Sequence, residues 1–104
     1  MQFDFPYTNS PEDARARLEV LGEYLNNRHG ILVTWIQPTK ATFAGRYMVV
    51  KIQGELTVDP GVVRFRGEDP GMLWRKKATQ YMQSKLAAYL DPGTPIEALP
   101  RDKK

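Results

Sequence analysis

Apolar and polar residues alternate along most of the segment 46–66. The apolar register holds Met48, Val50, Ile52, Leu56 and Val58, and after the turn Asp59-Pro60-Gly61 it resumes with Val63 and Phe65. Because successive side chains of a strand point to opposite faces, this pattern predicts a sheet with one buried face. It leaves open whether 46–58 is one bent strand or two strands that meet near Gly54.

The other register of the same segment predicts the open face of the sheet. It consists of Tyr47, Val49, Lys51, Gln53, Glu55, Thr57, Arg64 and Arg66. An aromatic side chain beside arginines favours contacts with nucleic acid or protein, although ordinary cross-strand surface pairs give the same pattern. Val49 and Val62 add apolar surface to this face, so a homodimer or another partner that covers it is a further expectation.

A first amphipathic helix is predicted at about 11–28. Ser10-Pro11 is typical of a helix start, and Gly30 suits a left-handed C-cap. Its apolar stripe recurs at helical spacing and consists of Ala14, Leu18, Leu21 and Leu25. The residues predicted to face away from this stripe are Arg15, Arg17, Glu19 and Glu23.

A second helix is predicted at about 70–90, because Asp69-Pro70 favours a helix start and Asp91-Pro92-Gly93 favours a stop. Its apolar stripe consists of Trp74, Ala78, Tyr81, Met82, Leu86, Tyr89 and Leu90. Arg75, Lys76 and Lys77 lie in its first turns, where cations oppose the helix dipole. This cluster predicts either a phosphate-binding site or a solvated helix face, and the neighbouring acids Glu68 and Asp69 weaken the first interpretation.

The order of these elements predicts an α+β fold. Strands are expected at 31–36, from 41 onward, and at 61–66, joined by short turns. The resulting α-β-β-β-α order predicts a two-layer sandwich, in which an antiparallel sheet of three or four strands carries both helices on one face. A single domain is expected at 10–91, followed by a proline-rich tail at 92–104.

The aromatic arm at 1–9 precedes this domain. It carries Phe3, Phe5 and Tyr7 at alternate positions. Such an arm either adds an edge strand, lies over the core or frays, and three aromatic side chains favour a docked arm.

The composition argues against an enzyme. The 104 residues include no cysteine, which excludes disulfides, thiol catalysis and thiolate metal sites. The only histidine, His29, lies at a helix C-terminus, where it interacts with the dipole. No glycine-rich phosphate loop and no nucleophilic serine elbow is present. The sequence therefore predicts a protein without catalytic residues, cofactor or metal.

Charge and hydropathy bound the partners and the compartment. The formal charge of +3 permits an anionic partner without requiring one. The N-terminus lacks the basic start and apolar run of a signal peptide, and no apolar run approaches the roughly 20 residues that span a bilayer. A cytoplasmic protein without a membrane span is expected.

The chain resembles the polyhydroxyalkanoic acid system family of small bacterial proteins over about 12–90. The residues that carry the resemblance are Ala14-Arg15 in the first helix, Trp35 and Phe43 in the strands, and the step Gly54-Glu55-Leu56-Thr57-Val58-Asp59. The resemblance implies the fold above and a link, through gene context, to polyester storage granules. It implies no catalytic residues, and the chain departs from the pattern in Arg75-Lys76-Lys77, in Trp74 and in its tail.

A weaker resemblance is to double-stranded RNA-binding domains, which share the α-β-β-β-α order. Lys76-Lys77-Ala78 is similar to the step with which those domains hold phosphates at the start of their last helix. The turn Pro38-Thr39-Lys40 lacks their usual minor-groove contact, so only one of their three contact regions is present.

These observations predict a small non-enzymatic binding or scaffolding protein of the polyhydroxyalkanoic acid system type. Its expected partner is a protein or the surface of a polyester granule. The alternative is a nucleic-acid-binding module. For either partner the candidate contact residues are Arg75, Lys76, Lys77, Arg64 and Arg66.

Overall fold

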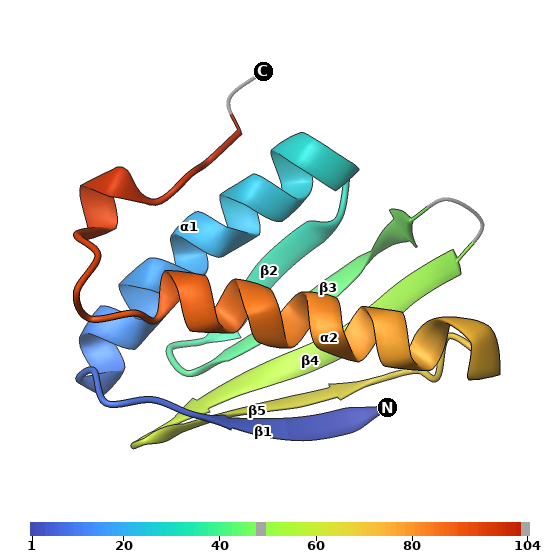
Figure 1. Ribbon diagram of the computed structural model, residues 1–104, viewed down its shortest axis with the longest axis horizontal. Helices are drawn as coiled ribbons and strands as arrows, with labels where there is room; N and C mark the ends of the chain where they lie inside the picture. The colour runs from blue at the N-terminus through green and yellow to red at the C-terminus, as the bar shows by residue number, and fades with distance from the viewer. Residues whose placement is uncertain (48–49, 103–104) are drawn as a thin grey trace.

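The computed structural model describes residues 1–47 and 50–102, which form an antiparallel sheet with two α-helices in front of it (Figure 1). The strands are β1 (Gln2–Pro6), β2 (Leu32–Gln37), β3 (Lys40–Tyr47), β4 (Val50–Asp59) and β5 (Val62–Gly67). They lie in the order β1-β5-β4-β3-β2, and each neighbouring pair is antiparallel. The predicted α+β class is confirmed.

The sheet has five strands, so the predicted number of three or four is wrong. One additional strand comes from the aromatic arm, which forms β1 and pairs with β5. Phe3 lies directly opposite Phe65, and their rings stack with centroids 4.9 Å apart. The alternating aromatics of the arm therefore act as the inner face of an edge strand.

The second difference is the division of 46–58 into β3 and β4, at 48–49 rather than near Gly54. Tyr47 pairs directly with Val50, and directly paired residues present their side chains to the same face. Tyr47 was predicted on the open face, and this prediction is wrong because the alternation was read through an unrecognised hairpin. Met48 and Val49, which were also assigned to faces, lie outside the described residues.

Gly54 lies within the regular part of β4, opposite Phe43 on one side and Gly67 on the other. A Cβ at this position would lie 2.5 Å from the carbonyl oxygen of Arg66. Only glycine therefore fits here without a shift of the backbone, and this explains the glycine that interrupts the apolar register.

The first helix, α1 (Pro11–His29), has the predicted limits to within one residue. The Ser10 side chain accepts a hydrogen bond from the Asp13 amide at 3.1 Å, and Glu12 and Asp13 complement the dipole. Gly30 closes the helix in the left-handed conformation, with φ of 72°.

The second helix, α2 (Met72–Tyr89), begins two residues later than predicted. Asp69 accepts a hydrogen bond from the Gly71 amide and pairs with Arg75, so it stabilises the preceding turn instead of capping the first amides. The N-cap position is occupied by Gly71, which has φ of 101° and no side chain to accept a hydrogen bond.

The core lies between the sheet and the helices. Its buried residues include Leu18, Leu21 and Leu25 of α1, Leu86 and Tyr89 of α2, and Leu56, Val58, Val63 and Phe65 of the sheet. Arg17, predicted to face water, is only 5% exposed. Its guanidinium donates to the Tyr89 and Asp91 carbonyl oxygens at 3.2 and 3.0 Å and pairs with Asp13, so α1 holds the C-terminal end of α2.

The residues after α2 return to α1. A short 3₁₀ helix, η1 (Ile96–Ala98), is followed by buried Leu99. Asn27 of α1 donates to the carbonyl oxygen of Arg101 at 2.9 Å, and Arg101 pairs with Glu23 at 2.7 Å. In Figure 1 this segment lies along α1, on the side of the helix that is farther from β1.

Candidate functional site

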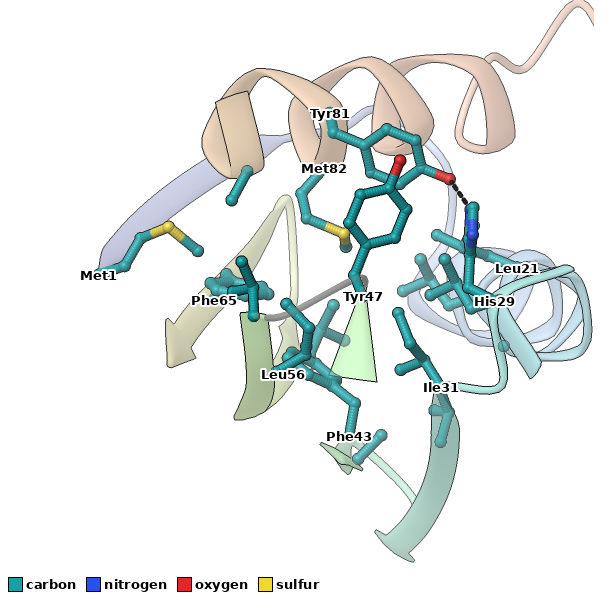
Figure 2. Close-up of a pocket in the computed structure, with 18 of the residues that line it drawn as sticks. Met1, Leu21, His29, Ile31, Phe43, Tyr47, Leu56, Phe65, Tyr81 and Met82 are labelled. Carbon is teal, nitrogen blue, oxygen red and sulfur yellow. Dashed lines mark hydrogen bonds between the residues drawn. The ribbon is translucent and has the colours of Figure 1, made fainter. Parts of the chain in front are cut away.

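A cavity of about 450 Å³ lies between α2, α1 and the inner face of the sheet (Figure 2). Protein interiors are close-packed and contain few voids larger than a water molecule. A cavity of this size falls within the range of ligand sites, about 300–1,000 Å³. In a chain of 104 residues it is therefore a distinct feature of the fold.

The floor of the cavity is apolar and well buried. Its lining residues with little exposure are Leu18, Leu21, Leu25, Ile31, Ala41, Phe43, Val50, Leu56 and Phe65. Trp35, Ile52 and Met82 also line it and are partly buried. Such walls bind aliphatic or aromatic groups and give no partner to a charged one.

The mouth of the cavity carries polar atoms from three elements. His29 at the end of α1 lies 2.9 Å, through Nε2, from the Tyr81 hydroxyl of α2. The Tyr47 ring of β3 lies edge-on to His29, with centroids 5.2 Å apart, and stands between the sheet and Tyr81 in Figure 2. Tyr47 and Tyr81 are 41% and 37% exposed, so this end opens to solvent.

Two side chains at the mouth are held in their neutral forms. Burial, together with the cations Arg28 and Lys85, lowers the pKa of His29 below its usual value of 6.5. Burial, with Tyr24 nearby, raises the pKa of Tyr81. At neutral pH the pair is therefore an uncharged imidazole hydrogen-bonded to an uncharged phenol.

The first turn of α2 exposes two large apolar side chains side by side. Met72 is 85% exposed and Leu73 is 87% exposed, the largest values among the large apolar residues that the structure describes. The next residue, Trp74, turns back and lines the cavity. Met72 and Leu73 are named the α2 tip below.

The predicted basic cluster does not act as one unit. Arg75 pairs with Asp69, which lowers the pKa of this carboxyl group. Lys76 is exposed beside the α2 tip. Lys77 is exposed at the cavity mouth, with its ammonium 5.7 Å from the centroid of the Trp74 ring.

Arg64 and Arg66 lie on the opposite face of the sheet, away from the cavity, as the alternation predicted. Arg64 pairs with Asp59 at 2.9 Å and with Asp4 at 3.6 Å. Arg66 lies opposite Glu55 and Gln2. These two arginines therefore belong to a face of mixed charge, and the structure does not bring them together with Arg75, Lys76 and Lys77.

The sequence did not indicate the cavity or its mouth. His29 was interpreted only as a helix-end charge, and Tyr81 only as part of an apolar stripe. One signal for the cavity was present in the apolar stripe of α2. The first half of this stripe combines large aromatic residues with the small Ala78, and its leucines occur only in the second half. A void depends on the distance between layers, which periodicity does not encode.

Neither a metal centre nor a membrane span is found in the described part of the chain. Among residues 1–47 and 50–102, no three His, Asp or Glu side chains lie close enough to hold a metal ion. Neither described helix is long and apolar enough to cross a bilayer.

Comparison with known protein families gives a match over most of the chain. A family model described as "Putative polyhydroxyalkanoic acid system protein" matches residues 2–92. The matched range includes β1, which the sequence resemblance had left out, and ends just after α2. No curated protein and no solved structure matches the chain.

Proposed function

Because the chain belongs to the polyhydroxyalkanoic acid system family, we propose that it is a non-enzymatic binding protein that attaches to the surface of the polyester itself. The family description names a system built on a polymer of hydroxyalkanoic acids and names no reaction. The polymer surface offers alkyl groups and ester carbonyls, so a protein that attaches to it needs an exposed apolar group.

The observation that carries this proposal is the α2 tip. Met72 and Leu73 are adjacent and almost fully exposed. Burying such a side chain contributes about 1.5–3 kcal/mol, which this fold does not use at either position. Transfer of both side chains to an apolar surface regains that free energy without changing the rest of the fold.

The charges around the α2 tip fit the same partner. Lys76 and Lys77 follow it within one turn, and their alkyl stems can lie along an apolar surface while the ammonium groups stay in water. An arrangement of apolar tip and flanking lysines is typical of segments that lie at an interface rather than within an apolar phase.

The nucleic-acid alternative has less support. Of the five candidate cations, Arg75 and Arg64 are already paired with carboxylates, and Arg64 and Arg66 lie on another face. Two lysines remain near the α2 tip, whereas phosphate recognition by shape needs cations spread over several contact regions.

Co-sedimentation with polyhydroxyalkanoate particles tests the proposal. The double variant Met72→Ser/Leu73→Ser is expected to lose most binding. A matched control is Leu32→Ser/Ile36→Ser, which removes two other exposed apolar residues, 56% and 54% exposed, and is expected to bind normally. Binding should persist at high salt, because apolar association does not depend on counterion release.

Two outcomes would contradict the proposal. An equal loss of particle binding in Met72→Ser/Leu73→Ser and Leu32→Ser/Ile36→Ser would mean that any exposed apolar residue contributes to non-specific adsorption. The second outcome is a protein that does not bind the particles but binds duplex RNA. If this binding weakens with salt and is lost in Lys76→Glu/Lys77→Glu, the nucleic-acid alternative is favoured.

A further inference from the structure

We propose that the cavity under α2 is a binding site for one medium-length aliphatic carboxylic acid, with its chain on the apolar floor and its carboxylate at the mouth beside Lys77 and Tyr47. This site is distinct from the α2 tip and does not depend on the granule proposal. Its ligand is a soluble small molecule, whereas the α2 tip is proposed to bind a polymer surface.

The apolar floor of the cavity favours an aliphatic chain in the ligand. From the half-exposed Tyr47 and Tyr81, the lining passes inward to Leu18 and Ala41, which are 4% and 1% exposed. The exposure of the lining residues therefore falls from this mouth toward the floor. An unbranched alkyl chain that enters there meets leucine, phenylalanine and tryptophan side chains on both layers and displaces no polar partner.

The charges at the mouth of the cavity favour a negatively charged end group in the ligand. Among the lining residues that the structure describes, Lys77 is the only side chain with a full charge, and no lining residue is acidic. Arg28 and Lys85 add positive potential next to His29. Asp102, which lies near enough to raise the pKa of His29 slightly, is paired with Arg28. A carboxylate is therefore attracted to this end.

The Tyr47 hydroxyl can donate a hydrogen bond to that group. Tyr47 is half-exposed and its ring stands in the mouth, pointing toward α2 (Figure 2). His29 already engages the Tyr81 hydroxyl at 2.9 Å, which orients Tyr81 across the opening. Lys77 precedes Tyr81 by four positions on α2, so the two side chains are neighbours on the helix surface. The polar atoms of these side chains border an otherwise apolar cavity, the arrangement of a site for an amphipathic ligand.

Intrinsic fluorescence provides a direct titration, because both tryptophans, Trp35 and Trp74, line the cavity. Decanoate, below its micellar concentration, is expected to change the emission saturably. Decanol should bind more weakly, and butyrate should not bind. No saturable change with decanoate, or the same response to butyrate, would overturn the proposal.

Filling the cavity tests the location. Ala78→Phe places a ring inside, and decanoate affinity is expected to fall at least about tenfold. Ala87→Phe adds the same ring on the exposed side of α2 and should bind as the wild type does. Thermal unfolding distinguishes blockage from misfolding, because a filled cavity keeps or raises the melting temperature. Undiminished binding by a folded Ala78→Phe protein would overturn the assignment.

Two lysine variants test the end group. Lys77→Gln should weaken decanoate about two- to fivefold, the range of an exposed ion pair, and leave decanol unchanged. Lys76→Gln, its exposed neighbour outside the cavity, should change neither. Equal effects of the two variants would reject the carboxylate position. The cavity proposal and the granule proposal can fail independently. Ala78→Phe should still bind the particles, and Met72→Ser/Leu73→Ser should still bind decanoate.

Discussion

The two ends of α2 are built in opposite ways. At the C-terminal end Leu86 is fully buried, Tyr89 is 2% exposed, and the buried Arg17 of α1 binds the last carbonyl groups. At the N-terminal end Met72 and Leu73 are in solvent, the cap is a glycine, and no acid stands in the first turn. One end of this helix is held by the fold, and the other is left with unused apolar surface.

This difference separates stability from function within one helix. The buried end satisfies its polar groups and closes the core, so changes there should unfold the protein. The exposed end lies over a cavity and contributes little to the core, so changes there should alter binding and leave the fold intact. The predictions below test this division.

A large loss of stability is expected for Arg17→Met. The variant leaves the carbonyl groups of Tyr89 and Asp91 without their donor and removes the partner of Asp13. Loss of a buried charged donor should lower the free energy of unfolding by about 2–4 kcal/mol, measured by urea denaturation. Arg28→Met is the control, since its 3.8 Å pair with Asp102 is exposed; a similar loss there would refute the special role of Arg17.

A pair of truncations compares the two ends directly. Leu86→Ala should destabilise the protein by about 2–5 kcal/mol, because it opens a cavity in a fully packed region. Leu73→Ala should change stability by less than about 0.5 kcal/mol, because its side chain is in solvent. Equal destabilisation by the two variants, in thermal or chemical unfolding, would show that α2 is packed along its whole length.

The cavity mouth predicts a pH dependence of stability. The folded-state pKa of His29 is lowered, so the unfolded chain binds the proton more readily. The contribution of the neutral imidazole is present above the usual pKa of 6.5 and is lost as the pH falls through the lowered value. Melting temperature should therefore decrease from about pH 7.5 to about pH 5.

His29→Gln should remove the decrease over this interval. The carboxyl group of Asp13, whose pKa is lowered by Asn9 and Arg17, titrates below the same interval and does not interfere. A decrease of the same size in the variant would assign the dependence to other groups.

Only a small effect on stability is expected for Leu73→Glu. An acid in the first turn of α2 complements the helix dipole and should leave stability unchanged or raise it by about 0.3–1 kcal/mol. Attachment to polyester particles should nevertheless be lost, because the tip is then charged. A destabilised variant, or one that binds the particles normally, would remove the assigned role of this end.

The sequence was sufficient where a local rule decides the structure. Ser10, Pro11 and Gly30 set the limits of α1, and alternation identified the inner residues of β4 and β5. It was insufficient for Tyr47, because the hairpin after β3 has no glycine or proline to mark it. The sequence wrongly predicted that Arg17 faces water. Its side chain is buried because it donates hydrogen bonds to the Tyr89 and Asp91 carbonyl oxygens, which lie more than 70 positions away in the sequence.

The candidate site was less accessible to such rules. The basic cluster at 75–77 was visible, but the pairing of Arg75 with Asp69 divides it. The exposure of Met72 and Leu73 depends on where α2 begins, and the cavity depends on how far α2 stands from the sheet. Both are products of packing between layers.

The place of β1 at the sheet edge has a consequence for biosynthesis. Its partner, β5, is made some sixty residues later, since Gln2 pairs with Arg66. During translation the aromatic side chains of Phe3 and Phe5 have no strand to lie against until Gly67 has left the ribosome. These aromatic side chains therefore remain unpaired while the residues between β1 and β5 are synthesised, and the sheet closes in a late, long-range step.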